Sequence, residues 1–424
     1  MECESTDDEQ MAALPAVPVL VFVATLCRNI LINTLNTQVC IIGAGPSGLL
    51  LSQLLAKAGI ESIVIDRKDR AYIEGRIRAG VLEQGTVTAL EDAGVADRLH
   101  AEGLSHDGFE LVFEGTRHRI DLAGLTGKSV MVYGQTEVTK DLFDARFNAG
   151  QQFFFDVKDV LPVDIKSNAP SVQFTVNGQQ HVIRCDYIAG CDGYHGVSRS
   201  AIPREVLQTY ERVYPFGWLG VLVEQPPVSH ELIYANHQRG FALASMRSDT
   251  RSRYYIQCDS NDNTGQWPDD RFWEELLRRL GPEIAAELHT GESFEKSIAP
   301  LRSFVAEPMR YGTLFLAGDA AHIVPPTGAK GLNLAVADIR LLSRALTEHY
   351  VTGNNTYIDN YSEIVLNRVW KVERFSWQLS QLMHQFTDHS PFEKRMQRAE
   401  FEYIAASEAA SKTIAENYVG LPLE

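Results

Sequence analysis

The sequence contains few cysteines, and none of the six forms the CxxC pair that structural metal sites and redox motifs use. Several lie in apolar runs typical of strands, which predicts reduced, buried thiols in a cytoplasmic protein rather than a disulfide framework. Positive charge is also scarce, because 39 Lys and Arg residues stand against 55 Asp and Glu residues, for a net charge of −16. A nucleic-acid-binding protein needs a basic face for the phosphates. We therefore expect no nucleic-acid partner, and we find no ligand pattern for a metal.

Residues 1–36 lack the features of a secretory signal, because the first ten residues are acidic rather than basic. The apolar stretch from Ala12 to Cys27 is short for a bilayer span and contains two prolines. Three interpretations are open: a weak membrane anchor, a poorly ordered tail, and an upstream start codon included in the chain. We favour the last two, and expect no membrane partner and a folded unit that begins at Thr37.

A turn with the pattern GxGxxG organises the rest of the chain. An apolar, β-branched run precedes it at 39–42, and a helical pattern that ends in glycine follows it at 49–59. Gly43 permits the tight turn, Gly45 has no Cβ to block a phosphate, and Gly48 lets helix and strand pack closely. Strand, turn and helix together predict a site for a dinucleotide pyrophosphate at a helix N-terminus.

Other strand ends carry polar residues that belong with this turn. A second apolar run, 62–65, ends at Asp66, whose carboxylate can accept hydrogen bonds from a ribose. An apolar strand also ends at Cys191-Asp192-Gly193, and another at Gly318-Asp319 before a loop with two prolines and two glycines. Prolines fix such a loop, and glycines admit a flat ring close to the backbone. We expect these pieces to converge on one ligand.

The order of the patterns predicts an α/β (α+β overall) protein with a Rossmann-like dinucleotide-binding domain, a β-sheet substrate domain and a helical C-terminal region. We expect a helix over 82–99, a hairpin from 109–113 and 117–122, a helix capped by Thr136 or Thr139, and an amphipathic helix over 269–280. The expected boundaries are 1–36 for the extension, 37–203 and 285–350 for the dinucleotide domain, 204–284 with parts of about 106–135 for the substrate domain, and 351–424 for the helical region.

Two long motifs carry a resemblance to a known family. The first runs from Gly318 to Asn333, and the second from Ile414 to Pro422. Together with the glycine turn and the Cys191-Asp192-Gly193 strand end, they resemble the flavin-dependent aromatic hydroxylases over about residues 37–424. The resemblance implies FAD as the cofactor, NADPH and O2 as co-substrates, and oxygen transfer from a C4a-hydroperoxyflavin to a small aromatic acid. It also implies a homodimer, with the helical C-terminal third as the interface.

The resemblance further implies which residues contact FAD. The glycine turn would lie at the pyrophosphate, Asp66 at the adenosine ribose and Asp319 at the ribityl chain. Asp66 departs from the glutamate that is usual there, but the shorter carboxylate can still reach a ribose. The expected cofactor residues are Gly43, Gly45, Gly48, Asp66, Arg76, Arg78, Gln135, Asp192, Gly193, Asp319, Gly328, Leu332 and Asn333.

On the substrate side, the resemblance implies 4-hydroxybenzoate, hydroxylated at carbon 3 to 3,4-dihydroxybenzoate. Ser245, Arg247 and Tyr255 would hold its carboxylate, which needs a partner once it is buried. Tyr234 would hydrogen-bond the 4-hydroxyl, and Tyr418 would extend a proton relay. The relay favours the phenolate, which is scarce at neutral pH because phenol has a pKa of about 10. The remaining expected catalytic residues are His106, placed further out towards solvent, and Pro326.

The electron donor has no second GxGxxG turn to bind to, so we expect NADPH to approach along a groove. A basic cluster follows Asp66, and the family's NADPH-preferring members carry Arg and Tyr at the positions of Arg67 and Tyr72. The candidate NADPH residues are Arg67, Lys68, Tyr72, His195 and Arg302, with Arg70 and Arg76 beside them.

Two alternatives remain at this stage. A sister enzyme could act on 3-hydroxybenzoate or 4-aminobenzoate, but Tyr234 and Tyr418 together favour a para-hydroxyl. A non-catalytic flavin-binding protein would need neither these tyrosines nor Arg247. We therefore expect an NADPH-dependent flavoprotein monooxygenase.

Overall fold

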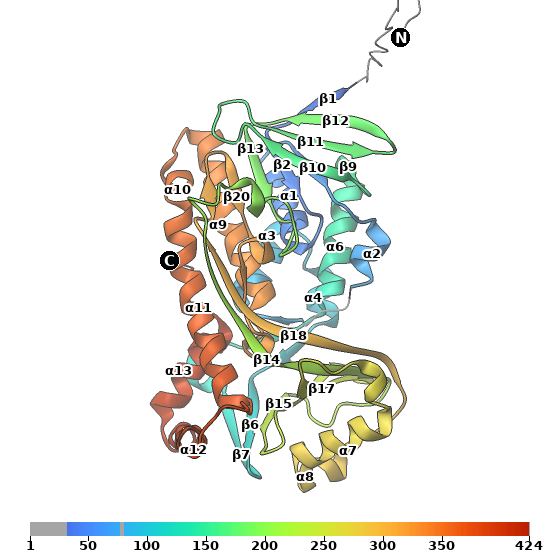
Figure 1. The fold of residues 1–424 in the computed structure, drawn as a ribbon, viewed down its shortest axis with the longest axis vertical. Coiled ribbons are helices and arrows are strands. Elements are labelled where there is room, and N and C mark those ends of the chain that lie inside the picture. Colours follow the sequence, from blue (N-terminus) through green and yellow to red (C-terminus); the bar gives the residue numbers. More distant parts are fainter. Residues whose placement is uncertain (1–31, 77–79, 424) are drawn as a thin grey trace, which may run out of the picture. The chain divides into compact units, whose positions relative to one another are not determined.

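A parallel sheet forms around the strand that precedes the glycine turn (Figure 1). β2 (Val39–Ile42) is buried at every residue and lies between β13 (Tyr187–Gly190) and β3 (Ser62–Ile65), parallel to both. A strand that is buried on both faces needs such a continuous apolar run, so both predicted strands are confirmed. The structure is a computed structural model that describes residues 32–76 and 80–423; most of the expected N-terminal extension lies outside these residues.

Three further strands complete this six-stranded sheet, whose order is β19-β20-β13-β2-β3-β9. β20 (Leu314–Leu316) is parallel to β13, and β9 (Phe153–Phe154) is parallel to β3, whereas β19 (Arg310–Tyr311) pairs antiparallel with β20. Because β2, β13 and β20 are parallel and adjacent, the segments that follow them leave the sheet at the same edge. That edge is where the sequence analysis expects the dinucleotide.

A separate four-stranded sheet corrects the expected start of the folded unit. β1 (Asn33–Asn36) pairs in parallel with β12 (Gln179–Arg184). The next strands of the sheet are β11 (Ser171–Val176) and then β10 (Lys158–Val163), both antiparallel to their neighbours. The described fold therefore starts before Thr37. The sequence gives little sign of β1, because this polar strand is mostly exposed and lacks hydrophobic alternation.

Helices cover the six-stranded sheet. α1 (Pro46–Lys57) packs against α6 (Gln135–Asn148), α9 (Gly331–Thr352) and α3 (Gln84–Ala93). The single helix expected over 82–99 is wrong, because α3 ends at a left-handed Gly94 and α4 (Asp97–Glu102) begins anew. The expected threonine cap is also wrong. Gly134 is the N-cap of α6, and the Thr139 hydroxyl instead donates to the Gln135 carbonyl inside the helix.

The second large sheet has eight strands in the order β21-β18-β14-β17-β16-β15-β6-β7. It contains the predicted hairpin and the strands expected to face the substrate. Its strands are β6 (Gly108–Phe113), β7 (Thr116–Asp121), β14 (Gln208–Val223), β15 (Leu232–Asn236), β16 (Ala242–Ser248), β17 (Arg251–Asp259), β18 (Ser293–Glu307) and β21 (His322–Ile323).

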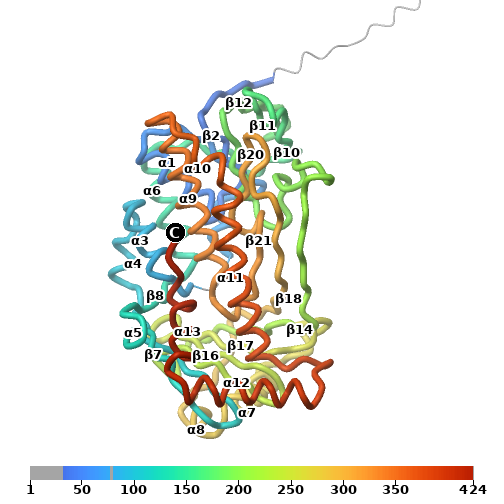
Figure 2. The backbone as a smooth tube through the Cα atoms, turned by 90° about the vertical axis from the view of Figure 1, so that its left-hand side faces the viewer, coloured from blue at the N-terminus to red at the C-terminus, as the bar shows by residue number. Residues whose placement is uncertain are grey.

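Two long antiparallel strands of this sheet, β14 and β18, pair along almost their whole length (Figures 1 and 2). The pairing shifts register between Val213 and Gly217. Before the shift β14 is largely exposed, and after it the strand is buried. β18 therefore belongs to the eight-stranded sheet, whereas the sequence analysis placed residues 285–307 in the dinucleotide domain.

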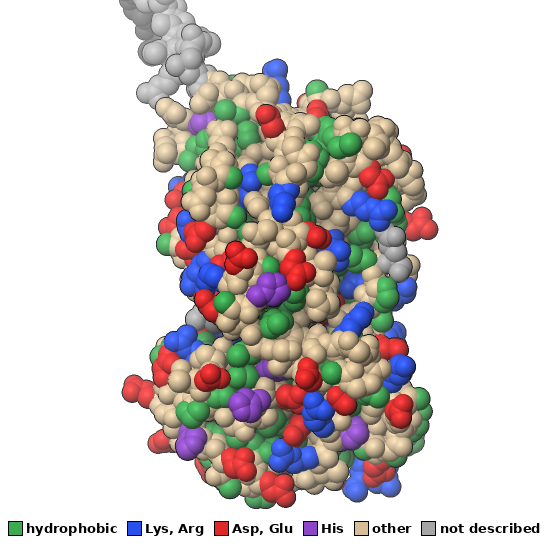
Figure 3. Space-filling model, turned by 180° about the vertical axis from the view of Figure 1, so that it is seen from behind, with side chains coloured by type: hydrophobic (Ala, Val, Ile, Leu, Met, Phe, Trp, Pro, Cys, Tyr) green, Lys and Arg blue, Asp and Glu red, His purple; other side chains and the backbone are tan. Residues whose placement is uncertain are grey.

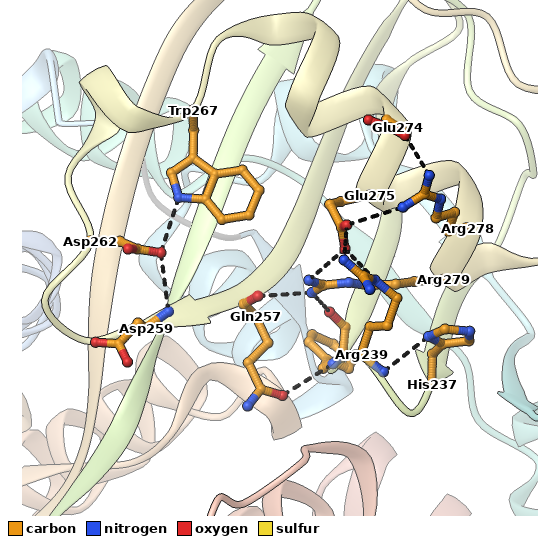
Figure 4. Close-up of polar contacts among 11 residues, drawn as sticks. His237, Arg239, Gln257, Asp259, Asp262, Trp267, Glu274, Glu275, Arg278 and Arg279 are labelled. Atoms are coloured by element: carbon orange, nitrogen blue, oxygen red, sulfur yellow. Dashed lines mark hydrogen bonds and ion pairs between the residues drawn. The ribbon is translucent and has the colours of Figure 1, made fainter.

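The predicted amphipathic helix is confirmed as α7 (Asp269–Leu280), which packs on the eight-stranded sheet and leads into α8 (Pro282–Glu287). A buried arginine fastens it there (Figure 4). Arg279 donates to the carbonyl oxygens of Phe241 and Gln257 at 3.1 and 2.8 Å, and it pairs with Glu275. Glu275 also pairs with Arg239 of the β15–β16 turn. The network holds the turn between the strands that carry Tyr234 and Arg247.

The remaining described elements are C-terminal helices and short pieces near the two sheets. α11 packs against α9 and β18, and α13 against α5 and β7 (Figure 2). These elements are α2 (Arg70–Glu74), α5 (Leu122–Thr126), α10 (Thr356–Asp359), α11 (Tyr361–Met383), α12 (Pro391–Ala406) and α13 (Glu408–Val419), and a three-stranded sheet of β4 (Val81–Leu82), β8 (Val130–Val132) and β5 (Leu104–His106).

Three observations complete the comparison with the sequence. The described cysteines, Cys40, Cys185, Cys191 and Cys258, are free and buried, as expected. No helix in the described residues is long and apolar enough to cross a membrane, and no cluster of metal-ligating side chains occurs among them. On the face shown in Figure 3, acidic and basic side chains are interspersed.

Candidate active site

The glycine turn lies against the ends of two other segments. A Cβ added to Gly43, whose φ is +111°, would lie 2.3 Å from the Cys191 carbonyl oxygen after β13. A Cβ added to Gly318, after β20, would lie 2.8 Å from Ser47 Oγ of α1 and 3.2 Å from Ala335 of α9. Only glycine permits such approaches. The structure thus brings together the three segments that the sequence analysis expected to converge.

The N-terminus of α1 presents an open cradle. Gly45 is its N-cap, no side chain caps the helix, and Pro46 occupies the first turn, where its missing N–H is not needed. A Cβ on Gly45 would meet no atom within 4 Å, whereas one on Gly48 would lie 1.9 Å from the Gly43 carbonyl oxygen. Gly48 therefore serves the packing of the turn, and Gly45 leaves space in front of the helix. Free amides beside such space suit a phosphate.

Carboxylates surround this cradle. Asp66 accepts from the backbone N–H of Ala44 at 2.6 Å and of Lys68 at 2.8 Å, so it ties β3 to the turn and keeps further lone pairs for a ribose. Burial raises its pKa, and these amide bonds oppose the rise. Asp192 accepts from Val197, and from the amide and hydroxyl of Ser198, through Oδ2. Its Oδ1 is buried without a hydrogen-bond partner in the described residues.

The Gly318-Asp319 turn is held from behind by a buried pair that the sequence analysis did not assign. Asp338 of α9 accepts from the Gly318 amide at 2.9 Å and pairs with His322 at 2.6 Å. The carboxylate raises the pKa of His322 against the effect of burial. Asp319 itself is exposed at the strand end. His322 stands in the first long motif, but Asp338 lies in an ordinary helical pattern.

The proline loop leads into α9, whose first turn is a second helix N-terminus near the glycine turn. Pro326–Gly328 form a 3-10 turn, and Ala329 has a φ of +54°. The side chain of Asn333, expected to contact flavin, is used within the protein: its oxygen accepts from Glu83 N and Thr86 Oγ1, and its nitrogen donates to Val81 and Ala329. The amide side chain is therefore bonded within the protein, and the first-turn amides, including that of Leu332, remain for a ligand.

The other expected cofactor and nucleotide residues lie on several elements. Gln135 opens α6, Gly193 follows Asp192 in a left-handed conformation, and Arg76 is exposed, whereas Arg78 lies outside the described residues. Lys68 and Arg76 both approach the ring of Tyr72, at 4.8 and 5.8 Å from its centroid. Arg70 is ion-paired with Glu74 and Asp144 and so is less suited to a phosphate. Arg67 and Lys68 are exposed.

His195 and Arg302 come together around a residue that the sequence analysis did not name. The His195 ring lies edge-on to Tyr194, and the Arg302 guanidinium lies 4.5 Å from the centre of the same ring. Arg302 also pairs with Glu211 at 3.0 Å. This group adjoins the Asp192 strand end, so the two expected NADPH residues share one location.

The expected substrate residues share one face of the eight-stranded sheet. Tyr234 of β15 is opposite Leu243 of β16, and Leu243 is opposite Tyr255 of β17. Because side chains alternate between faces, Ser245 lies on the same face as Leu243. Arg247 follows at the end of β16, where the register shifts, and its guanidinium interacts with Tyr255.

Arg247 is a half-buried cation with an unused donor. Its Nη1 is buried and has no hydrogen-bond partner among the described residues. Burial lowers the pKa of its guanidinium from the usual value, while Tyr255 partly restores it. An unpaired buried charge is costly, so the site suits an anion that would complete the hydrogen bonds. A carboxylate matches the planar guanidinium geometry.

Two tyrosines far apart in the sequence meet at the other end of this face. The hydroxyls of Tyr234 and Tyr418 are 2.9 Å apart, and both side chains are buried. Phe109, which the sequence analysis did not name, stacks on Tyr418 at 4.3 Å and lies edge-on to Tyr234 at 5.5 Å. Burial and the bond to Tyr418 raise the pKa of Tyr234 well above 10. The pKa of Tyr418 is raised to about 12, mainly by burial.

His106 is not placed towards solvent, and that expectation is wrong. The residue ends β5, pairs with Val130, and is only 1% exposed. Neither ring nitrogen has a hydrogen-bond partner in the described residues, and burial lowers its pKa to about 4. The ring is therefore neutral at neutral pH. Pro326, in contrast, is exposed at the start of its turn.

The chain is similar to known proteins along most of its length. A profile of the FAD binding domain family matches residues 36–376. The chain belongs to this family. It is 58% identical over 393 residues to p-hydroxybenzoate hydroxylase of Acinetobacter baylyi, which covers 92% of the chain and 97% of that relative. It is 27% identical to 6-hydroxy-3-succinoylpyridine 3-monooxygenase of Pseudomonas putida, over 80% of the chain and 85% of that relative.

Solved structures show the same fold. The crystal structure of p-nitrophenol 4-monooxygenase from Pseudomonas putida superposes with a TM-score of 0.77, covers 92% of this chain and 100% of that chain, and has 19% sequence identity. The family resemblance drawn from the motifs is thus confirmed, as are the α/β fold class, FAD as cofactor, and an enzyme that acts as an FAD-dependent monooxygenase.

The residues present fit FAD. The space in front of Gly45, the unpartnered Oδ1 of Asp192, the exposed Asp319 and the amides of α9 surround one edge of the sheet. When bound there, FAD supplies the redox chemistry and the activation of oxygen. The amides at the start of α1 and α9 would hold its phosphates and ring edge, and the carboxylates would accept hydrogen bonds from its hydroxyls.

The glycine turn gives a prediction with an internal control. Gly48→Ala should lower the free energy of unfolding of the apoprotein by about 2 kcal/mol, because the new Cβ collides with the Gly43 carbonyl. Gly45→Ala should leave the apoprotein as stable as the wild type but weaken FAD binding at least about tenfold, because its Cβ enters only the ligand's space. Urea unfolding and titration of flavin fluorescence measure the two effects. Unchanged FAD affinity in Gly45→Ala would contradict this placement of the pyrophosphate.

Proposed function

We propose that the protein hydroxylates 4-hydroxybenzoate at carbon 3, using NADPH and O2 and forming 3,4-dihydroxybenzoate, NADP⁺ and water. The observation that carries the proposal is the shared sheet face, with a guanidinium whose buried Nη1 lacks a partner in the described residues at one end and a pair of buried tyrosine hydroxyls at the other. The relative that is 58% identical bears the name of this activity. An alternative substrate without a para-hydroxyl would have no hydroxyl group for the tyrosine pair to bind.

The spacing of the two ends supports a para-substituted benzoate. Leu243, opposite Tyr234, is four residues from Arg247 along β16. At about 3.3 Å per residue this is roughly 13 Å along the strand. Two inward-pointing side chains can hold a ring with a carboxylate at one end and a hydroxyl at the other within this span. Ser245, between them, adds a hydroxyl beside the carboxylate.

Tyr234 acts as a hydrogen-bond donor rather than as a base. Because its pKa lies well above 10, it stays protonated at neutral pH and cannot accept the substrate's proton without passing one on. Its hydroxyl donates to the substrate oxygen. The Tyr418 hydroxyl is the next group in the relay, because it is hydrogen-bonded to the Tyr234 hydroxyl. A donor in contact with the substrate oxygen stabilises the phenolate over the phenol. The carbon beside a phenolate oxygen is more nucleophilic, so carbon 3 becomes the site of oxygen transfer.

The nucleotide residues suit NADPH. Arg67 and Lys68 lie exposed after the ribose-binding Asp66, and Tyr72 offers its ring to Lys68. His195 and Arg302 lie together around the Tyr194 ring, where Arg302 also pairs with Glu211. We propose that the first group selects the 2′-phosphate and the second binds the pyrophosphate. In an acidic chain, such local basic groups are exceptions, and they suit an anionic co-substrate such as NADPH.

We further propose a homodimer and a cytoplasmic location. Trp370 and Trp377 of α11 are 41% and 42% exposed and border a cleft of about 370 Å³ with Tyr210 of β14. Large exposed aromatic residues in one area mark association surfaces, and the free, buried cysteines suit a reducing compartment. Light scattering on the purified protein at several concentrations tests the dimer, and cell fractionation tests the location.

The decisive assay follows NADPH oxidation by the FAD-loaded enzyme with and without 4-hydroxybenzoate, while 3,4-dihydroxybenzoate is quantified. We expect the substrate to accelerate NADPH oxidation at least about tenfold, with close to one product formed per NADPH and poorer efficiency with NADH. The same assay with 3-hydroxybenzoate and 4-aminobenzoate separates the sister activities. A rate that does not respond to 4-hydroxybenzoate would refute the proposal.

Arg247→Lys should weaken binding of 4-hydroxybenzoate by about ten- to a hundredfold. A point-charge ammonium cannot reproduce the two parallel hydrogen bonds of the guanidinium fork, which are worth roughly 1.5–3 kcal/mol. The exposed Arg251→Lys, on the neighbouring strand, is the matched control and should bind normally. Titration of the flavin absorbance with substrate measures both. Equal affinities would place the carboxylate elsewhere.

Tyr234→Phe should bind 4-hydroxybenzoate within about fivefold of the wild type, since one hydrogen bond to the phenol contributes about 1 kcal/mol or less. Less phenolate forms, however, so NADPH oxidation should continue while the product per NADPH falls and hydrogen peroxide is released. Oxygen consumption with and without catalase gives the ratio. Full coupling in this variant would remove Tyr234 from its role.

A further inference from the structure

The tyrosine pair depends on a residue at the very end of a helix. Tyr418 is the second-last residue of α13, after which residues 420–423 continue without helix or strand. We call residues 420–423 the C-terminal strap. The last carbonyl groups of a helix lack intrahelical partners, so the end of a helix frays unless other groups hold it. The position of the Tyr418 hydroxyl therefore depends on what fixes the strap.

Three buried charges meet the end of α13. Lys330, the N-cap of α9, donates to the Tyr418 carbonyl at 2.7 Å and to Glu83 at 2.6 Å. Arg368 of α11 lies 3.5 Å from the other oxygen of Glu83. All three residues are at most 8% exposed. The cation of Lys330 thus stabilises the carbonyl end of α13, where a positive charge is favoured.

Arg368 holds the strap itself. One of its nitrogens, Nη1, donates to the carbonyl oxygens of Leu421 at 2.7 Å and Pro422 at 2.8 Å. Gly420, just before them, has a φ of +98°, and a Cβ there would lie 2.0 Å from Glu83 Oε2. The strap therefore runs in direct contact with the acid of the cluster. Its path is defined by Glu83 on one side and by Arg368 on the other.

The strap and the charges complete one another. Two cations face a single carboxylate, so Glu83 alone cannot balance them. Three carbonyl oxygens, which carry partial negative charge, accept hydrogen bonds from the two cations: that of Tyr418 from Lys330, and those of Leu421 and Pro422 from Arg368. Removing the carbonyls would leave a buried cation short of acceptors, which is costly. This mutual dependence gives the strap one position.

We infer that Arg368 is a positioning residue for the tyrosine pair, which acts through the C-terminal strap. It contacts neither tyrosine hydroxyl. By fixing the chain directly after α13, it keeps the Tyr418 hydroxyl 2.9 Å from that of Tyr234, and so sets how well the pair stabilises a phenolate. The inference rests on the proposed function, because the phenolate belongs to 4-hydroxybenzoate.

The test uses Arg368→Lys in the FAD-loaded enzyme. Lysine keeps the charge beside Glu83 but cannot reproduce the guanidinium contacts with two carbonyls and Glu83 together. We expect the pKa of the bound 4-hydroxybenzoate phenol, read from its ultraviolet spectrum against pH, to rise by roughly 0.5 to 1, a three- to tenfold loss of phenolate. Hydrogen exchange in residues 419–423 should speed up about tenfold, and substrate affinity at a pH where the phenol is protonated should change less than about twofold.

A second variant and two controls separate positioning from a general loss of stability. A chain that ends at Gly420 lacks the acceptors of Arg368 and should raise the phenol pKa equally, and adding Arg368→Lys to it should change nothing further. Arg368→Lys should also have no effect on the phenol pKa in a Tyr418→Phe background. Arg374→Lys, on the same helix and in contact with the Asn417 side chain, should behave as the wild type.

An unchanged phenol pKa in Arg368→Lys, or an equal rise in Arg374→Lys, would overturn the inference. Wild-type exchange rates in the strap would do the same. If the wild-type enzyme bound no 4-hydroxybenzoate, the proposed function would fail, and the exchange rates would still decide whether Arg368 holds the strap. The two failures are therefore distinguishable.

Discussion

The approach of the glycine turn to the end of β13 is the constraint on which the rest of the molecule depends. Gly43 can follow β2 so closely past the Cys191 carbonyl only because it has no Cβ. That approach sets the distance between neighbouring parallel strands at the edge where the ligand binds. From this edge α1 starts with open amides, Asp192 keeps one oxygen without a hydrogen-bond partner in the described residues, and Gly318 fits between α1 and α9. A larger residue at either glycine would separate segments that must act on one cofactor.

The cofactor edge depends on close backbone packing, whereas the substrate sheet and the helices beside it depend on buried cations and their partners. Arg279, Lys330 and Arg368 are buried; each donates to a carbonyl oxygen and pairs with a carboxylate, although the Nε atoms of Arg279 and Arg368 have no hydrogen-bond partner among the described residues. Arg247 differs because, among the described residues, no carboxylate lies within ion-pair distance of it and its buried Nη1 also has no hydrogen-bond partner. Of these four cations it is therefore the one suited to pairing with an anionic ligand.

The sequence predicts those features that a short segment determines by itself. The strands at 39–42 and 62–65, the hairpin at 109–122 and the helix α7 follow from local hydrophobic spacing, and the turn glycines follow from steric need. Local pattern failed at Gly94, where a left-handed residue splits a continuous helical periodicity, and at β1, whose polar side chains give no alternation.

Site features that depend on distant partners were out of reach. Nothing in the residues near His106 shows that neighbouring elements bury it. The hydrogen bonds of the Asn333 side chain are made with Glu83, Thr86 and Val81, about 250 residues away in the sequence. The pairing of Asp338 with His322, and of Phe109 with Tyr418, likewise arises only when the chain folds. The resemblance to a family supplied Tyr234 and Tyr418, because residue type alone marks them as packing tyrosines.

The long pairing of β14 with β18 has a mechanical consequence. The half of this ribbon before the shift at Val213 contacts the Tyr194 ring through Phe304 and Arg302, and the half after it pairs with β17 in the substrate sheet. Two hydrogen-bonded strands resist stretching along their length and bend most readily where their register shifts, between Val213 and Gly217 and again between Leu222 and Val223. The region around Tyr194 and the substrate sheet are thus joined by paired strands rather than by a loop, and we expect a displacement of one to bend the ribbon at the shift that separates its two halves.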